Sequence, residues 1–297
     1  MGEKIVKVDS PQGIEATAKW QEIYNRLLLT NGYDGSAECL NENYKFWKRL
    51  ETLARECSCG DQYRDEVVVS KKGYPEGYKV RDINEQIDII AESFELSPIY
   101  AKSFIKNLPQ FPPVEKAEGW FAFAKSESVV KNLSEFSISQ IQVEAMKIIL
   151  RYLNLCEDCR GYTVLEERFR QNRKTLHFLS RIKEEQEGDI IIIPAQHGLL
   201  HRGKSNSRAR ETLLENEFGL GSFHVGCMRM SHSERYGEDC LNVNCPGDKI
   251  ALFDKSNYRD AITWYYSREK NIRCSIYKDT ANEYSAPVTG FYFPTPC

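Results

Sequence analysis

Four consecutive isoleucines, Ile190 to Ile193, set the first limit on how this chain can fold. β-branched side chains favour extended backbone, and the run lacks the 3.6-residue period of an amphipathic helix. It therefore predicts a β-strand over residues 189–193. A second apolar segment, from Phe223 to Met230, follows two closely spaced glycines and is predicted to be another strand.

The segment after the isoleucines matches a phosphate-binding loop. Residues Gly198 to Ser205 read Gly-Leu-Leu-His-Arg-Gly-Lys-Ser, which fits the pattern G-x-x-x-x-G-K-[ST]. In such a loop the backbone N–H groups surround phosphate oxygens, the lysine reaches the outer phosphates and the serine binds Mg²⁺. Lys204 and Ser205 stand at those two positions, and Asp254 follows an apolar segment that could bring it to the metal. This match predicts a Mg²⁺-dependent nucleotide-binding enzyme.

The sequence around the loop favours a different reading of the same residues. The loop interior carries bulky side chains, residues 194–197 separate it from the strand, and the chain beyond Ser205 reads as antiparallel strands rather than repeated βα units. A basic loop over 201–210 that leads into a helix through about Phe218 can still hold phosphates by charge and by free N–H groups. The residues of this predicted anion site are His201, Arg202, Lys204, Ser205, Arg208 and Arg210.

The leading hypothesis is therefore a protein that binds phosphate anions or nucleic acid, and the nucleotide-binding enzyme is the alternative. The formal net charge is −3, so contact with nucleic acid must come from a local basic patch. The basic segment 160–183 would add to such a patch. The arginines of the loop could instead pair with nearby glutamates, which would leave no anion site. The expected partners are nucleic acid or a phosphorylated small molecule.

Ten cysteines give a third hypothesis, a zinc-stabilised interaction module. Cys156 and Cys159 form a C-x-x-C pair, which is half of a zinc site, and Cys240 and Cys245 could complete it. Reduced cysteines scattered through a core are the plainer alternative. The possible cofactors are thus Zn²⁺ or Mg²⁺.

The order of predicted elements indicates an α+β fold with a mainly helical N-terminal part and a C-terminal part rich in antiparallel strands. Apolar residues at helical spacing predict helices over 15–29, 40–57 and 139–153, and further strands are expected at 66–70, 249–253, 261–266, 273–277 and 288–293. The paired prolines of the 108–113 stretch predict a linker. We expect a mainly helical domain over 1–108 and a helix plus antiparallel β domain over 114–297.

Two short helices predicted between Ile87 and Leu108 resemble a helix-turn-helix, which would imply DNA binding. Ala91, Leu96 and Phe104 fit that family's pattern, but Glu95 stands where its turn has glycine. An ordinary helical hairpin is the alternative. The N-terminus has no secretory signal and the chain has no apolar run long enough for a membrane span, so we expect a cytoplasmic, soluble protein.

Several short motifs carry a wider resemblance. Pro194-Ala-Gln-His-Gly198, Glu217-Phe-Gly-Leu-Gly221 and Cys245-Pro-Gly-Asp248 are similar to segments of a group of predicted bacterial proteins with no assigned function. The similarity covers residues 119–297. It implies no particular chemistry.

Overall fold

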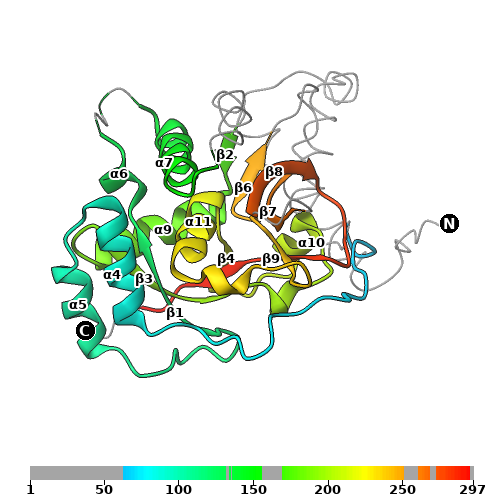
Figure 1. The fold of residues 1–297 in the computed structure, drawn as a ribbon, viewed down its shortest axis with the longest axis horizontal. Helices are drawn as coiled ribbons and strands as arrows, with labels where there is room; N and C mark the ends of the chain where they lie inside the picture. The colour runs from blue at the N-terminus through cyan, green and yellow to red at the C-terminus, as the bar shows by residue number, and fades with distance from the viewer. Residues whose placement is uncertain are drawn as a thin grey trace, which may run out of the picture. The chain divides into compact units, whose positions relative to one another are not determined.

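The computed structural model describes residues 63–131, 134, 136–155, 169–250, 260–267 and 272–294. The chain separates into two compact units, Met1–Gly60 and Asp61–Cys297, and all described residues belong to the second. That unit has an α+β fold, as predicted, with helices more frequent early in the chain and strands later (Figure 1). The helices expected at 15–29 and 40–57 lie outside the described residues. Among the helices that are described, none has the length and apolar character needed to cross a membrane.

The isoleucine run forms the centre of a four-stranded antiparallel sheet. Its strand order is β1 (Gly119–Ala124), β3 (Ile190–Gln196), β10 (Thr289–Phe291) and β4 (Glu217–Gly219). Phe121 lies opposite Ile193 in the register of β1 and β3. Every residue of β3 is buried. The predicted strand over 189–193 is confirmed.

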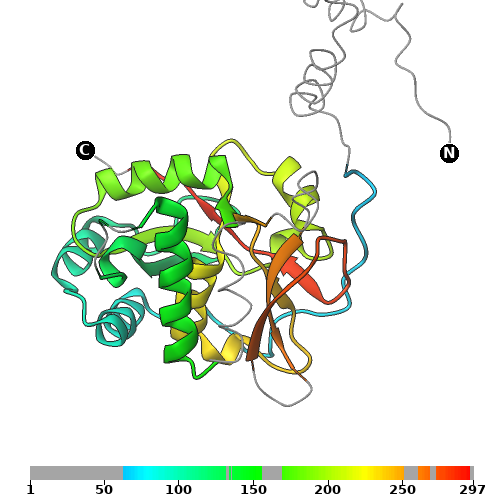
Figure 2. The ribbon, with the colours of Figure 1, turned by 90° about the horizontal axis from the view of Figure 1, so that it is seen from above.

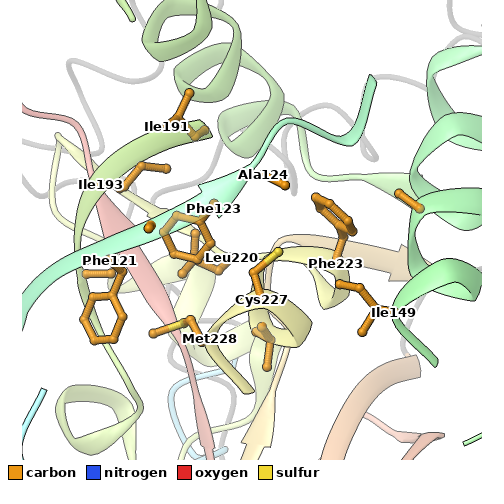
Figure 3. Packing of buried hydrophobic residues seen from close by; sticks show 14 of the residues in the cluster. Phe121, Phe123, Ala124, Ile149, Ile191, Ile193, Leu220, Phe223, Cys227 and Met228 are labelled. Carbon is orange, nitrogen blue, oxygen red and sulfur yellow. The ribbon is translucent and has the colours of Figure 1, made fainter. Parts of the chain in front are cut away.

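The described residues also form α-helices, several of which pack on this sheet. They are α4 (Ile83–Phe94), α5 (Ile99–Phe104), α6 (Ser126–Val129), α7 (Ile138–Tyr152), α9 (Arg173–Glu185), α10 (Asn206–Glu211) and α11 (Ser222–Ser231). Both α4 and α11 pack on β1, and α11 also packs against α7, beside which it runs in Figure 2. Phe121 and Phe123 from β1 meet Phe223 and Met228 from α11 in the apolar cluster of Figure 3.

A second, six-stranded sheet occupies the other part of the unit (Figure 1). It is built from β2 (Phe169–Gln171), β5 (Asn242–Asn244), β6 (Asp248–Ile250), β7 (Asp260–Tyr266), β8 (Ile272–Lys278) and β9 (Ser285–Pro287). The order is β2-β6-β7-β5-β9, with β8 also paired to β7. All pairs are antiparallel except β5 with β9. The strands predicted at 261–266 and 273–277 are confirmed.

Two local predictions around residues 206–230 are wrong. The segment Phe223–Met230, predicted as a strand, belongs to α11, where residues 222–228 are all buried. A helix that is apolar on all sides shows no amphipathic period and cannot be told from a buried strand by pattern alone. The helix expected between Arg210 and Phe218 is also not there: α10 covers Asn206–Glu211, the predicted polar arm, and residues 217–219 belong to the first sheet as β4.

The stretch 108–113, predicted as a linker between domains, lies inside the unit that begins at Asp61. Buried Gln86 of α4 joins its two sides: its Nε2 donates to Trp120 O at 3.0 Å, and its Oε1 accepts from Ala122 N at 3.2 Å. The helices on either side of Glu95 exist as predicted, and Glu95 has a left-handed backbone with φ 56°. The predicted 66–70 strand is reduced to one β-bridge, between Val67 and Lys204.

Candidate active site

The loop from Gly198 to Ser205 is folded onto protein atoms. Most of its backbone N–H groups donate to protein oxygens: Gly198 to Gln196 Oε1 at 2.6 Å, Gly203 to Ser285 O at 3.1 Å and Ser205 to Glu66 O at 3.2 Å. Residues 199–201 form a turn of 3-10 helix. A phosphate in this loop would have to displace these internal bonds.

The lysine of the G-x-x-x-x-G-K-S pattern, Lys204, also contacts protein groups. Lys204 Nζ lies 3.1 Å from His201 Nδ1 and donates to Thr212 Oγ1 at 3.0 Å. Since the ammonium donates to Nδ1, the His201 ring donates through Nε2 to Glu217 Oε1, at 2.6 Å. Both His201 and Glu217 are buried. Burial and the nearby charge of Arg208 lower the pKa of Lys204.

The N-terminus of α10 already holds an anion, the buried carboxylate of Asp279. Its oxygens accept from the backbone of Asn206 at 2.6 Å and of Ser207 at 2.9 Å. Ser205, the N-cap, accepts instead from Arg208 N. Asp279 thus occupies the place where a phosphate was expected at this helix.

The three arginines of the predicted anion site have different surroundings. Arg208 pairs with Glu211 at 3.4 Å, and Arg210 donates to the backbone oxygens of Pro246 and Asp248 at 2.8 and 2.6 Å. Arg202 is exposed. The structure therefore brings five of the six predicted residues together as an internal network and leaves Arg202 on the surface.

The structure describes two of the four cysteines of the predicted zinc site. Cys156 and Cys159 lie outside the described residues, while Cys240 and Cys245 are free thiols. Burial raises the pKa of both described thiols, which opposes the thiolate form that zinc requires. Within the described ranges, no group of three or more His, Cys, Asp or Glu residues could hold a metal ion.

A cleft of about 670 Å³ opens at a different place, beside the start of β1. Its wall combines aromatic and charged side chains, among them Tyr74, Tyr78, Arg81, Glu118, Trp120 and Leu199. The size is that of a small-molecule site, for which ~300–1,000 Å³ is usual. A pocket with a few converging polar groups on an otherwise apolar wall is the expected form of a ligand site.

Glu118 is one of two acidic residues, with Asp82, among the described residues that line this cleft. The pairing of β1 with β3 positions it, since its backbone N donates to Ala195 O at 2.8 Å. Its Oε1 accepts from the Tyr74 hydroxyl at 2.6 Å, and its Oε2 accepts from His197 N at 3.1 Å. Burial raises the pKa of the Glu118 carboxyl, although these two hydrogen bonds oppose the shift.

A chain of hydrogen bonds runs inward from the cleft through His197. The hydroxyl of Tyr78, a residue of the cleft lining, lies 3.1 Å from His197 Nδ1, and His197 Nε2 lies 3.3 Å from the hydroxyl of buried Tyr236. Burial and the positive charge of Arg235 lower the pKa of His197 well below its usual value, so the ring is neutral at pH 7. A neutral imidazole has one donor and one acceptor. One tyrosine therefore donates to the ring and the other accepts from it.

Arg235 supplies a fully buried positive charge behind the cleft wall. Its guanidinium stacks over the Tyr74 ring at 4.2 Å and donates to the backbone oxygens of His197 and Leu241 at 3.2 and 3.1 Å. No carboxylate of the described residues lies within 4.0 Å of it. The charge of Arg235 opposes the burial-driven rise in the pKa of Glu118, Tyr74 and Tyr78. It therefore stabilises negative charge along one wall of the cleft.

Sequence reasoning missed this site almost completely. From the sequence, Glu118, Tyr74 and His197 were assigned no role. Tyr74 lies in a glycine- and proline-containing turn, and Glu118 precedes an apolar strand, so their local patterns are those of ordinary surface residues. An available signal was the position of Glu118 and His197 at adjoining strand ends, but only the pairing of β1 with β3 makes those ends neighbours.

Comparison of the chain with family models, curated proteins and solved structures found no match.

Proposed function

We propose that the cleft beside β1 binds a small organic molecule and that Glu118 exchanges a proton with it, as the general acid or base of an enzyme. The observation that carries this proposal is the placement of Glu118. It is a carboxyl group on the wall of a cleft, with both oxygens held and its pKa raised by burial. Acids with a raised pKa in a cleft are frequent at functional sites, since proton transfer is most efficient when the pKa is near the working pH.

The surrounding groups suit this role. Tyr74 accepts from Leu199 N at 3.3 Å while it donates to Glu118, so its hydroxyl is fixed in orientation. Burial raises the pKa of Tyr74 and Tyr78, and both phenols therefore remain protonated donors at neutral pH. Arg235 stabilises negative charge that develops on this wall. A ligand is thus offered a carboxyl group held in a fixed orientation, beside aromatic side chains.

Phosphate-anion or nucleic-acid binding through residues 201–210 stays a prediction, as do nucleotide binding with Mg²⁺ and zinc binding. The inward contacts of Lys204, Arg208 and Arg210 give the anion hypothesis less support than the cleft has. Binding of a polynucleotide whose affinity falls steeply with salt would revive it. Binding of Mg-ATP by the wild type that is abolished in Lys204→Ala would support the nucleotide hypothesis.

The test uses the full chain and two matched variants, Glu118→Gln and Glu115→Gln. Glu115 lies three residues earlier and is exposed, so its variant controls for the loss of a carboxylate. A metabolite library is screened by thermal shift, and hits are measured by calorimetry in buffers of different ionisation enthalpy. We expect binding with proton uptake or release in the wild type and in Glu115→Gln, and no proton exchange in Glu118→Gln.

A second readout does not depend on finding a ligand. The ¹³C carboxyl resonance of Glu118 is followed against pH, and a midpoint above the ordinary glutamate value of about 4.3 is expected. A midpoint at or below that value would contradict the assigned role. So would hits whose binding and proton exchange are unchanged in Glu118→Gln.

A further inference from the structure

The two faces of the second sheet differ sharply in character. Side chains alternate across a strand, so Val243 of β5 and Trp264 of β7, which pair with each other, face the core. Their neighbours Asn244 and Thr263, which also pair, face the opposite side. An outer face of this kind normally lies open to water.

Here the outer face is the floor of a hollow. Asn244, Thr263 and Ser285 are only 4%, 6% and 4% exposed, although all three are polar. Thr263 Oγ1 donates to Asn244 Oδ1 at 2.8 Å, and Asn244 Nδ2 donates to Ser285 Oγ at 3.2 Å. The floor is thus a connected row of amide and hydroxyl groups in fixed orientation beneath a hollow of about 360 Å³.

Aromatic side chains and one loop form the walls of this hollow. Tyr265 and Tyr277 meet edge to face with ring centroids 5.6 Å apart, and Tyr277 is 48% exposed. Lys278, the last residue of β8, also lines it, and the loop that follows adds Thr280 and Asn282. Asp279 lines the same hollow, but its carboxylate accepts hydrogen bonds from the N-terminus of α10.

We propose that this hollow is a binding site for a neutral sugar, separate from the Glu118 cleft. A sugar presents hydroxyl groups that both donate and accept, and the amide and hydroxyl groups of the lining can do the same. It also has apolar C–H faces, which pack against aromatic rings such as that of Tyr277. The size of the hollow lies in the range of small-molecule sites.

Other ligand classes fit this lining less well. A phosphorylated ligand needs several cations or free N–H groups, whereas Lys278 is the single cationic side chain among the described lining residues. A lipid or other apolar ligand would displace water from the polar lining without replacing the hydrogen bonds of that water, which is unfavourable. A neutral ligand with many hydroxyl groups satisfies the floor and the walls together.

The test applies an array of neutral mono- and oligosaccharides to the full chain, followed by calorimetry with the sugars that bind. Tyr277→Ala removes the aromatic wall, and Tyr284→Ala is its matched control, since Tyr284 is 45% exposed and is not part of the lining. We expect affinity to fall at least about tenfold in Tyr277→Ala and to stay unchanged in Tyr284→Ala. Glu118→Gln should leave sugar binding intact, which separates this site from the proposed acid–base cleft.

A second variant tests the location without removing a contact. Thr280→Trp places a large side chain at the exposed loop of the hollow and should block binding while the protein remains folded by circular dichroism. Absence of binding to every sugar at millimolar concentration would overturn the proposal. Equal loss of affinity in the two tyrosine variants, or full affinity in Thr280→Trp, would overturn it as well.

Discussion

Asp248 gives the structure a pH dependence whose size can be worked out. Its carboxylate is buried and caps α11 from a distant strand, because Oδ2 accepts from Ser222 N at 2.6 Å. Oδ1 has no hydrogen-bond partner in the described part of the chain. Burial raises the pKa of Asp248 from 3.8 to about 7, against the opposing hydrogen bonds from Ser222.

The sign of the effect follows from proton binding. Between pH 3.8 and about 7 the folded state keeps a proton that the unfolded state has lost, so the free energy of unfolding falls as pH rises. Each pH unit between the two values is worth about 1.4 kcal/mol, which gives a total of about 4 kcal/mol. Over the accessible range from pH 5 to pH 7.5 this one group should lower stability by about 2.5 kcal/mol.

Urea unfolding of wild type and Asp248→Asn at those two pH values measures this contribution. The amide keeps an acceptor for Ser222 N but does not titrate, so the pH-dependent loss should be smaller in the variant by about 2.5 kcal/mol. Asp239→Asn is the control, since the Asp239 side chain is 92% exposed. An equal pH dependence in wild type and Asp248→Asn would refute the reasoning and would mean that Asp248 is ionised in the folded protein throughout this range.

Three further predictions concern single side chains. Burial lowers the pKa of His232 to about 4, so its ring resonances should titrate near that pH. As pH falls from 6.5 through 4, this group should lower the free energy of unfolding by about 3 kcal/mol. Gly203→Ala should lower the free energy of unfolding, measured in urea, by about 3 kcal/mol or more, because φ is +77° and the added Cβ would overlap the carbonyl oxygen of Val68. Gly77 has a similar φ of +75° but open space around it, so Gly77→Ala should lower the free energy of unfolding by only about 1 kcal/mol. Lys204→Ala should lose about 1–2 kcal/mol of unfolding free energy with its two internal hydrogen bonds, whereas exposed Arg202→Ala should stay within about 0.5 kcal/mol. Equal effects within either pair would contradict the contacts on which these predictions rest.

The α+β class and several elements could be predicted from the sequence because they depend on local pattern. The isoleucine run became β3, and the apolar periodicity of 139–153 became α7, which begins one residue earlier. Its N-cap is Ser137, which forms a capping box with Gln140. Such signals lie within a few residues of the element that they specify, so a single sequence contains them.

Tertiary structure decided the parts that bear on function. The G-x-x-x-x-G-K-S pattern is local, but whether its N–H groups are free depends on Glu66 and Ser285, far away in the chain. Asp279 likewise reaches the N-terminus of α10 across more than seventy residues. Glu118 and His197 become neighbours only through the register of β1 and β3, because a strand's own sequence determines its faces but not its partner. The sequence by itself determined elements with a strong local pattern, such as β3 and α7. The pairing and packing of the elements decided the type of the segment 222–231, and they decided which polar groups are bonded inside the protein and which lie on the wall of a cleft.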